Sequence, residues 1–489
     1  MKQSSKSVKK TSFASDVLKL VSGTAFAQGL TICASPFLTR LYGPEAFGTL
    51  ALFVSITSII GAIACLRYEL AIMLPESDEE AANLLGVSLC FVVLISILTV
   101  PMVWLGKPII PGLLKAPQLA AYLWLVPPMV FFSGTLLAFN YWNSRRKYFG
   151  RLSLARIFQS VTTTITQLGS GYIGYGNGGS LIGASVAGFT MSSLALAGQI
   201  WREDSHLLRQ NINWYGIRQA LKRYSKFPLY DTWASLLNII SWQLPTLLLS
   251  NFFSASVVGY YALAFRLMSL PMNFIGRSIG QVFFQRASVA KSNGKLAEVV
   301  EETFSHLVKV SMFPILILTL TGQDIFVLAF GEQWRESGIY VQILGGWSFF
   351  WFIASPISTL FTVLERQQDL LYIQTGIFIS RLLSLSIGGY FFNEKLALAL
   401  FSISGIFLYG YKASFAIYIS GVKISVIFQK VLSELLLFIP VGILLISMYS
   451  IKVSTVIIVI INSLILIIYY LYLLLNKKLK IKHSKDNNC

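Results

Sequence analysis

The chain has 489 residues, of which 55% are apolar and only 12% are charged, and its formal net charge is +18. An ordinary soluble domain carries roughly 25% charged residues, so this composition excludes a soluble protein. Apolar runs of about 20 residues, the length that crosses a bilayer core of about 30 Å, recur from residue 17 to residue 475. We therefore predict an all-α polytopic membrane protein.

About fourteen spans account for these runs. In chain order we place them at 17–41, 46–74, 81–105, 119–141, 152–175, 179–201, 227–251, 256–284, 305–330, 338–364, 370–392, 396–419, 430–449 and 453–475. Because little of the chain is left outside them, we expect no soluble catalytic domain and no enzyme.

Lysine and arginine set the predicted orientation, since positively charged loops stay in the cytoplasm. With both termini inside, the outer loops hold only a few of the 39, namely Arg40, Lys107, Lys115, Arg335, Lys395 and Lys452. The positive charge is thus explained by topology and by contact with anionic lipids. We predict no nucleic-acid partner.

A weak internal repeat relates the two halves of the chain. At a constant offset of 211 residues Gly48 aligns with Gly259, and Ala51 with Ala262. Such pseudo-symmetry is characteristic of secondary transporters, whose substrate lies between the repeats. We expect two six-helix lobes with two peripheral C-terminal helices.

This organisation predicts six segments. They are a basic cytoplasmic tail (1–16), an N-lobe with spans 1–6 (17–201), an amphipathic cytoplasmic linker (202–226), a C-lobe with spans 7–12 (227–420), spans 13 and 14 (421–475) and a second basic tail (476–489).

The sequence LRYELAIMLPESDEEA, residues 66–81, contains two different charged groups. Ser77 and Glu80 have the spacing of a capping box in front of the third span, and the acidic residues there suit a helix N-terminus. Arg67 and Glu69 lie inside the predicted second span and need another explanation.

Charged residues inside spans are costly, at about 2.5–3.5 kcal/mol each on insertion scales. Several facing lipid would jeopardise insertion, so we predict that they line a water-filled, cationic cavity. An excess of arginine there indicates an anionic substrate, although snorkelling to the cytoplasmic surface is an alternative for Lys19, Lys309 and Arg67. The candidate cavity residues are Lys19, Arg67, Glu69, Arg266, Arg277, Arg381 and Lys412.

Cysteine and histidine indicate no metal site. Cys33, Cys65 and Cys90 lie in spans, Cys489 ends the chain, and no CxxC pair occurs. The histidines are isolated, so we predict neither a disulfide framework nor a bound metal or other cofactor.

Residues 22–53, SGTAFAQGLTICASPFLTRLYGPEAFGTLALF, followed by LRYELAIMLPESDEEAANLL, resemble the Wzx-type O-antigen and capsule flippases of bacterial polysaccharide clusters. The resemblance implies the fold of the multidrug/oligosaccharidyl-lipid/polysaccharide exporter superfamily and alternating access in the bacterial inner membrane. The implied cargo is an undecaprenyl-diphosphate-linked oligosaccharide, and the implied partners are a polysaccharide polymerase and a chain-length regulator.

Ion coupling stays open between H⁺ and Na⁺. Lipid II flippases of the same superfamily carry a sodium site made of acids on the seventh and eleventh helices. Here Asp231 matches the first position, but the eleventh span offers Arg381, so an Asp231–Arg381 ion pair is an alternative. Two rival functions are a membrane-embedded polysaccharide polymerase and a drug or ion antiporter of the same fold.

Overall fold

The structure is a computed structural model that describes residues 13–451 and 453–486. Helices and turns make up the described residues, and no strand occurs among them. The chain forms two compact units, Met1–Gly259 and Tyr260–Cys489. The predicted all-α class is confirmed.

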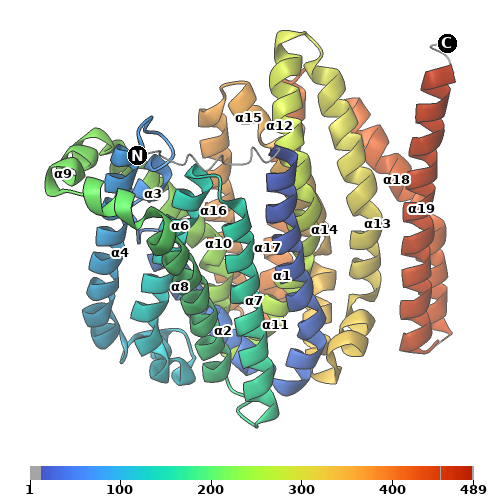
Figure 1. Ribbon diagram of the computed structural model, residues 1–489. Helices are drawn as coiled ribbons and strands as arrows, with labels where there is room; N and C mark the ends of the chain where they lie inside the picture. The colour runs from blue at the N-terminus through green and yellow to red at the C-terminus, as the bar shows by residue number, and fades with distance from the viewer. Residues whose placement is uncertain (1–12, 452, 487–489) are drawn as a thin grey trace. The chain divides into compact units, whose positions relative to one another are not determined.

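The first unit contains the helices of the predicted N-lobe and of the seventh span (Figure 1). They are α1 (Phe13–Leu41), α2 (Pro44–Gly61), α3 (Tyr68–Ala71), α4 (Asp78–Gly106), α5 (Ile110–Leu113), η1 (Pro117–Ala121), η2 (Leu123–Leu125), α6 (Val126–Arg145), α7 (Phe149–Tyr172), α8 (Gly178–Asn211), α9 (Trp214–Arg223), η3 (Phe227–Asp231), α10 (Thr232–Phe252) and the start of α11 (Ala255–Met268).

The second unit contains the rest of α11 and the later helices. They are η4 (Met272–Gly276), α12 (Arg277–Ser292), α13 (Leu296–Phe330), η5 (Glu332–Trp334), α14 (Arg335–Ile357), α15 (Leu360–Val363), α16 (Gln367–Tyr390), α17 (Glu394–Ile419), α18 (Ile424–Ser450) and α19 (Thr455–Asp486). Helix α19 thus continues into the stretch predicted as a basic tail.

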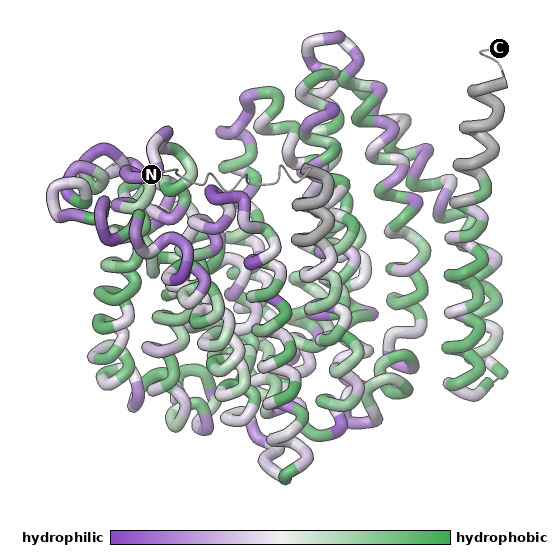
Figure 2. The backbone as a smooth tube through the Cα atoms, viewed as in Figure 1, coloured by the Kyte–Doolittle hydropathy of each residue, from purple (hydrophilic) through white to green (hydrophobic). Residues whose placement is uncertain are grey.

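Membrane-spanning helices dominate both units. Within the described residues, ten helices are long and apolar enough to cross a membrane. The other predicted spans coincide with the more polar helices α1, α7 and α10 and with the shorter α11. Hydrophobic residues run along the helices, and hydrophilic residues gather near helix ends (Figure 2). The chain is therefore a multi-pass membrane protein.

Two predicted spans are interrupted. Helix α2 ends at Gly61 instead of continuing to residue 74. Turns over residues 62–67 follow, in which Leu66 and Arg67 adopt left-handed backbone conformations with φ of 45° and 64°. In the eighth span a five-residue π-helix, η4, separates α11 from α12. Both interruptions lie beside predicted cavity arginines, and π-helical turns are frequent at functional sites.

Helices α2 and α11 meet at two glycines that the sequence repeat pairs. A Cβ on Gly48 would lie 1.7 Å from the carbonyl oxygen of Ala255, and one on Gly259 would lie 1.9 Å from that of Pro44. The two contacts are reciprocal, since Pro44 and Ala255 are also 211 residues apart. All four residues belong to the first unit. The repeat is thus visible as a local two-fold contact in which glycine lets two backbones approach.

Helices α18 and α19 pack against α13. The rings of Phe313 and Tyr469 stack with centroids 3.8 Å apart, and Asn462 donates a hydrogen bond of 2.9 Å to Thr321. Many of the described side chains of α19 are exposed, as expected of a lipid-facing helix. The contacts of Tyr469 and Asn462 fix one face of it to α13.

Candidate functional site

Arg67 and Glu69 form an ion pair at the break that follows α2. Arg67 Nη1 donates to Glu69 Oε1 over 3.4 Å, and the Glu69 side chain is 1% exposed while that of Arg67 is 28% exposed. Arg67 Nε and Glu69 Oε2 are buried and have no hydrogen-bond partner among the described residues. The pair therefore leaves hydrogen-bonding capacity that a ligand or water could use.

Arg266 and Arg277 lie on either side of the π-helix η4. Arg266, near the end of α11, is half-buried, and Arg277, the first residue of α12, is exposed. No hydrogen bond or ion pair joins either guanidinium to another described residue. The sequence predicted that Arg266 and Arg277 lie on one continuous helix. The π-helix between them changes the rotation and rise of the chain, so the distance between the two residues does not follow from α-helical rise alone.

Arg381 and Lys412 are buried in the core of the second unit, each 4% exposed. Arg381 Nη2 donates to the hydroxyl of Tyr409 over 2.8 Å. The Lys412 Nζ lies 5.9 Å from the centroid of the same tyrosine ring. The structure thus brings these two predicted residues together around Tyr409.

A band of aromatic rings leads from Tyr409 to the residue next to Arg266. Trp347 contacts Tyr409 edge-on at 6.3 Å, and Trp347 and Trp351 are parallel at 5.4 Å. Phe265 stacks on both tryptophans, at 6.3 Å and 5.9 Å. The sequence did not single out this band, because its members come from α11, α14 and α17.

Asp231 and Lys19 are the two remaining predicted site residues. Asp231 ends η3 with an exposed side chain, and no ion pair connects it to another described residue. Lys19 falls within α1, but its side chain is outside the part of the chain whose side chains are described. No group of three or more His, Cys, Asp or Glu that could hold a metal occurs among the described residues.

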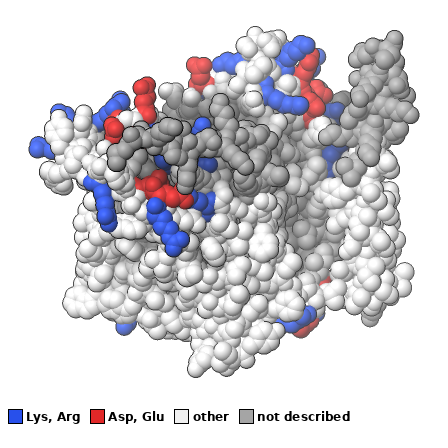
Figure 3. Space-filling view, in the orientation of Figure 1, with Lys and Arg blue, Asp and Glu red and all other residues white. Residues whose placement is uncertain are grey.

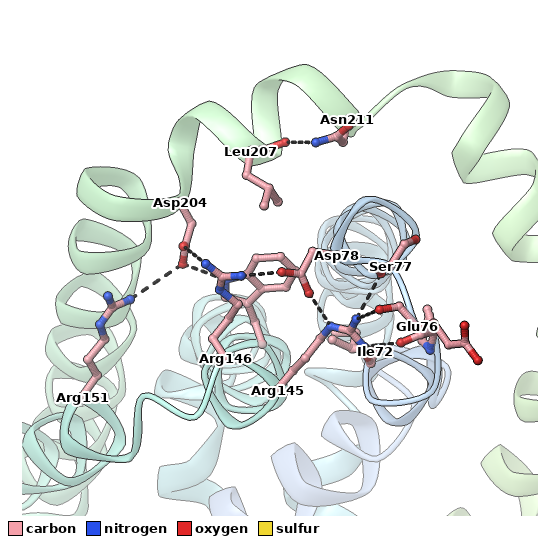
Figure 4. Close-up of polar contacts among 12 residues, drawn as sticks. Ile72, Glu76, Ser77, Asp78, Arg145, Arg146, Arg151, Asp204, Leu207 and Asn211 are labelled. Carbon is pink, nitrogen blue, oxygen red and sulfur yellow. Dashed lines mark hydrogen bonds and ion pairs between the residues drawn. The ribbon is translucent and has the colours of Figure 1, made fainter. Parts of the chain in front are cut away.

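A charged cluster that the sequence did not predict joins four helices of the first unit (Figure 4). Asp204 on α8 is 2% exposed and accepts a hydrogen bond of 3.0 Å from Trp142 Nε1. Its carboxylate also lies 3.5 Å from Arg146 and 3.7 Å from Arg151. Arg146 reaches on to Asp78, at the start of α4. We call Asp78, Arg145, Arg146, Arg151 and Asp204 the charged cluster.

Arg145 binds the loop before α4 by several hydrogen bonds. It donates to the carbonyl oxygens of Ile72 and Pro75, at 3.1 Å and 2.7 Å, and to Asp78 Oδ1 at 3.1 Å. Burial lowers the pKa of Arg146, but the carboxylates of Asp204 and Asp78 raise it, and the net shift is upward. Arg146 therefore stays charged, and both arginines link the end of α6 to the start of α4.

The predicted capping box is half formed. Ser77 Oγ accepts a hydrogen bond of 3.2 Å from the backbone N–H of Glu80. The Glu80 carboxylate does not turn back to the cap; it accepts bonds of 2.8 Å and 3.0 Å from Arg223 on α9. The cap is thus confirmed, and its acidic member serves a tertiary contact instead.

Comparison with known proteins identifies the family. A family model described as a polysaccharide biosynthesis protein matches residues 37–338, more than half of the chain. The chain belongs to this family. The match covers the charged cluster, the α2–α11 crossing and the arginines Arg67, Arg266 and Arg277.

Curated relatives are distant. The teichuronic acid biosynthesis protein TuaB of Bacillus subtilis (strain 168) is 20% identical over 327 residues, 63% of each chain. An uncharacterized membrane protein in the cps region of Klebsiella pneumoniae is 27% identical over 143 residues, 29% of this chain and 30% of that protein. The chain therefore spans less than two thirds of the length of these relatives.

Solved structures show the fold. A lipid II flippase MurJ in an inward closed conformation superposes with a TM-score of 0.69 at 16% identity, covering 93% of this chain and 98% of that one. An inward-facing multidrug resistance MATE family transporter of the MOP superfamily gives 0.66 at 15% identity, covering 85% and 99%. The expected fold is thus confirmed.

Proposed function

We propose that the chain is a flippase that moves an undecaprenyl-diphosphate-linked oligosaccharide from the cytoplasmic to the periplasmic leaflet by alternating access. Membership of a polysaccharide biosynthesis family supports a role with polysaccharide precursors. The likeness to MurJ, a lipid II flippase, supports a fold able to carry a lipid-linked cargo. A multi-pass chain with few residues outside its spans suits transport better than a soluble step of synthesis.

The observation that carries the proposal is that Arg266 and Arg277 have no carboxylate partner among the described residues. Arg266 is half-buried, and Arg277 begins a helix just after a π-helical turn. An unpaired guanidinium within a membrane is costly unless it meets an anion or water. A diphosphate provides that anion, and guanidinium groups bind phosphate oxygens through two parallel hydrogen bonds.

In the proposed mechanism the diphosphate moves between basic side chains. Arg67 in the first unit and Arg277 in the second each bind it, and Arg266 binds it at a different stage of transport. Glu69 positions Arg67 and competes with the cargo for its guanidinium, so that binding stays reversible. Lys19, Arg381 and Lys412 add positive potential around the path in this proposal.

Transport needs two conformations that expose the cargo to opposite sides. The Gly48–Gly259 crossing supplies a contact that can pivot, because two helices touch there through backbone atoms. The break after Gly61 and the π-helix η4 provide two further points at which spans can bend. In this proposal Asp231 binds the coupling cation, H⁺ or Na⁺, because its carboxylate is exposed.

The function is tested by surface polysaccharide in a strain that lacks its own flippase gene. The wild-type chain should restore surface glycan, and Arg67→Gln and Arg277→Gln should abolish it while the protein remains in the membrane. Lysine at either position should retain partial activity, since it keeps the charge and loses the forked geometry. Normal surface glycan from both glutamine variants at normal protein level would show that these arginines do not carry cargo.

A further inference from the structure

Helix α9 is fixed to the start of α4 at both of its ends. At its N-terminus the backbone N–H of Asn213 donates to Asn83 Oδ1 over 3.1 Å. At its C-terminus Arg223 binds Glu80, and the Tyr68 hydroxyl donates to the carbonyl oxygen of Leu221 over 3.2 Å. These contacts involve different parts of the first unit, so α9 does not move freely as a linker would.

The contacts also set the depth of α9 in the membrane. Helix α4 begins at Asp78, where the candidate membrane span begins. The residues of α4 that contact α9 or the turn before it run from Glu80 to Gly86. Gly86 lies against Ile212, just before α9, and Ile217, within it. At a rise of about 1.5 Å per residue this is within roughly two turns of the end of the span. This position predicts that α9 lies at the level of the lipid headgroups.

The outer side of α9 carries aromatic and basic residues. Trp214 and Tyr215 are 77% and 78% exposed. Arg218 and Lys222 follow Trp214 at intervals of four residues, so the three side chains lie along one edge of the helix. Both cations are exposed, and no hydrogen bond or ion pair connects either of them to another described residue.

The end of α8 also carries an exposed tryptophan next to an arginine. Trp201 is 60% exposed, and the guanidinium of Arg209 lies over its ring, 4.3 Å from the centroid. Tryptophan and tyrosine concentrate at membrane interfaces, where an apolar ring can meet the acyl boundary and its polar atom can meet water. Figure 3 shows lysine and arginine on the surface near this side of the first unit.

We propose that Trp201, Arg209, Trp214, Arg218 and Lys222, which we call the linker surface, bind the headgroups of anionic phospholipids. The aromatic rings would lie at the acyl boundary, while Arg218 and Lys222 contact phosphate oxygens. An anionic lipid fits this surface better than an acidic protein does. Its headgroup can contact the cations while the exposed tryptophans lie at the acyl boundary. The lipid would hold the segment between the two repeats at the membrane surface. This role is independent of the cargo.

The test uses the full chain in nanodiscs with brominated lipids, which quench nearby tryptophan fluorescence. The signal of Trp214 is obtained by subtracting the same measurement on Trp214→Phe, a change at an exposed position. Brominated phosphatidylglycerol should quench Trp214 more strongly than brominated phosphatidylcholine at equal content. Each basic residue near an anionic surface contributes about 1 kcal/mol, equivalent to roughly five-fold. Arg218→Gln and Lys222→Gln should therefore each lower this preference by about that factor.

The matched control is Arg286→Gln with Lys295→Gln, which removes two exposed cations from the end of α12 and the loop before α13. It should leave the preference of Trp214 for phosphatidylglycerol unchanged. Equal quenching by both lipids, no quenching by either, or an unchanged preference in the Arg218→Gln, Lys222→Gln double variant would each overturn the proposal. The last result would favour a protein partner at the linker surface.

Discussion

Arginine has two contrasting environments in this protein. In the charged cluster of the first unit, Arg145, Arg146 and Arg151 each meet a carboxylate of another helix. In the second unit, Arg266 and Arg277 meet none among the described residues. The first group neutralises its charge internally and ties helices together, whereas the second keeps positive charge available. The same residue type therefore stabilises one region and can bind an anion in the other.

The largest effect should come from breaking the charged cluster at its most buried member. Asp204→Ala leaves Arg146, Arg151 and Trp142 Nε1 without their shared partner. Removing one side of a buried ion pair costs about 3–5 kcal/mol, so thermal unfolding of the purified protein should occur at a markedly lower temperature.

Glu203→Gln is the matched control for that change, because Glu203 pairs with Arg151 but its side chain is 58% exposed. An exposed pair contributes about 1 kcal/mol or less. Equal loss of thermal stability in both variants would contradict the idea that the buried carboxylate holds the cluster.

A smaller loss is expected at the helix crossing. Gly259→Ala places a Cβ where the carbonyl oxygen of Pro44 lies 1.9 Å away, so α2 and α11 must separate. Overpacking of this kind costs about 1–3 kcal/mol. Surface glycan should fall as well, since the proposed mechanism uses the crossing as a pivot. Gly29→Ala, where a Cβ meets open space, should leave stability and surface glycan unchanged. Similar losses in both variants would show that the close contact at Gly259 is not the cause.

Stability should change least at Lys412. Lys412→Met keeps a similar shape and removes a buried charge, and replacing buried charges by apolar groups is often neutral or stabilising. The melting temperature should therefore stay the same or rise, while surface glycan decreases if the charge serves the cargo. A strongly lowered melting temperature would show that the ammonium group has a structural partner.

The sequence predicted those features of the fold that depend on residues close together in the chain. Apolar length predicted the helices, and Ser77 predicted the N-terminus of α4. The repeat aligned Gly48 with Gly259, and the structure shows that these two residues are also in contact. The break after α2 was missed because residues 62–67 contain no proline or glycine, and left-handed φ values at Leu66 and Arg67 are not expected of these residue types.

Other features depend on contacts that no local pattern encodes. The π-helix η4 follows Pro271, but a proline predicts an interruption without its type. The charged cluster joins Asp78, Arg145 and Asp204, which are far apart in the chain. Its charged residues are visible in the sequence as the basic stretch SRRKYFGR, residues 144–151, and the acidic residues 203–204. Their pairing depends on which helices are neighbours, and the sequence does not show that.

Binding of a polyprenyl diphosphate to the purified chain tests the central contrast most directly. Arg266→Gln should weaken this binding by at least about ten-fold, as expected for the loss of a charged hydrogen bond worth about 1.5–3 kcal/mol, without lowering the melting temperature. Arg151→Gln should do the reverse, lowering the melting temperature while the folded protein binds normally. Unchanged binding in Arg266→Gln, or equal effects of both variants on binding, would contradict the assignment of the unpaired arginines to the cargo.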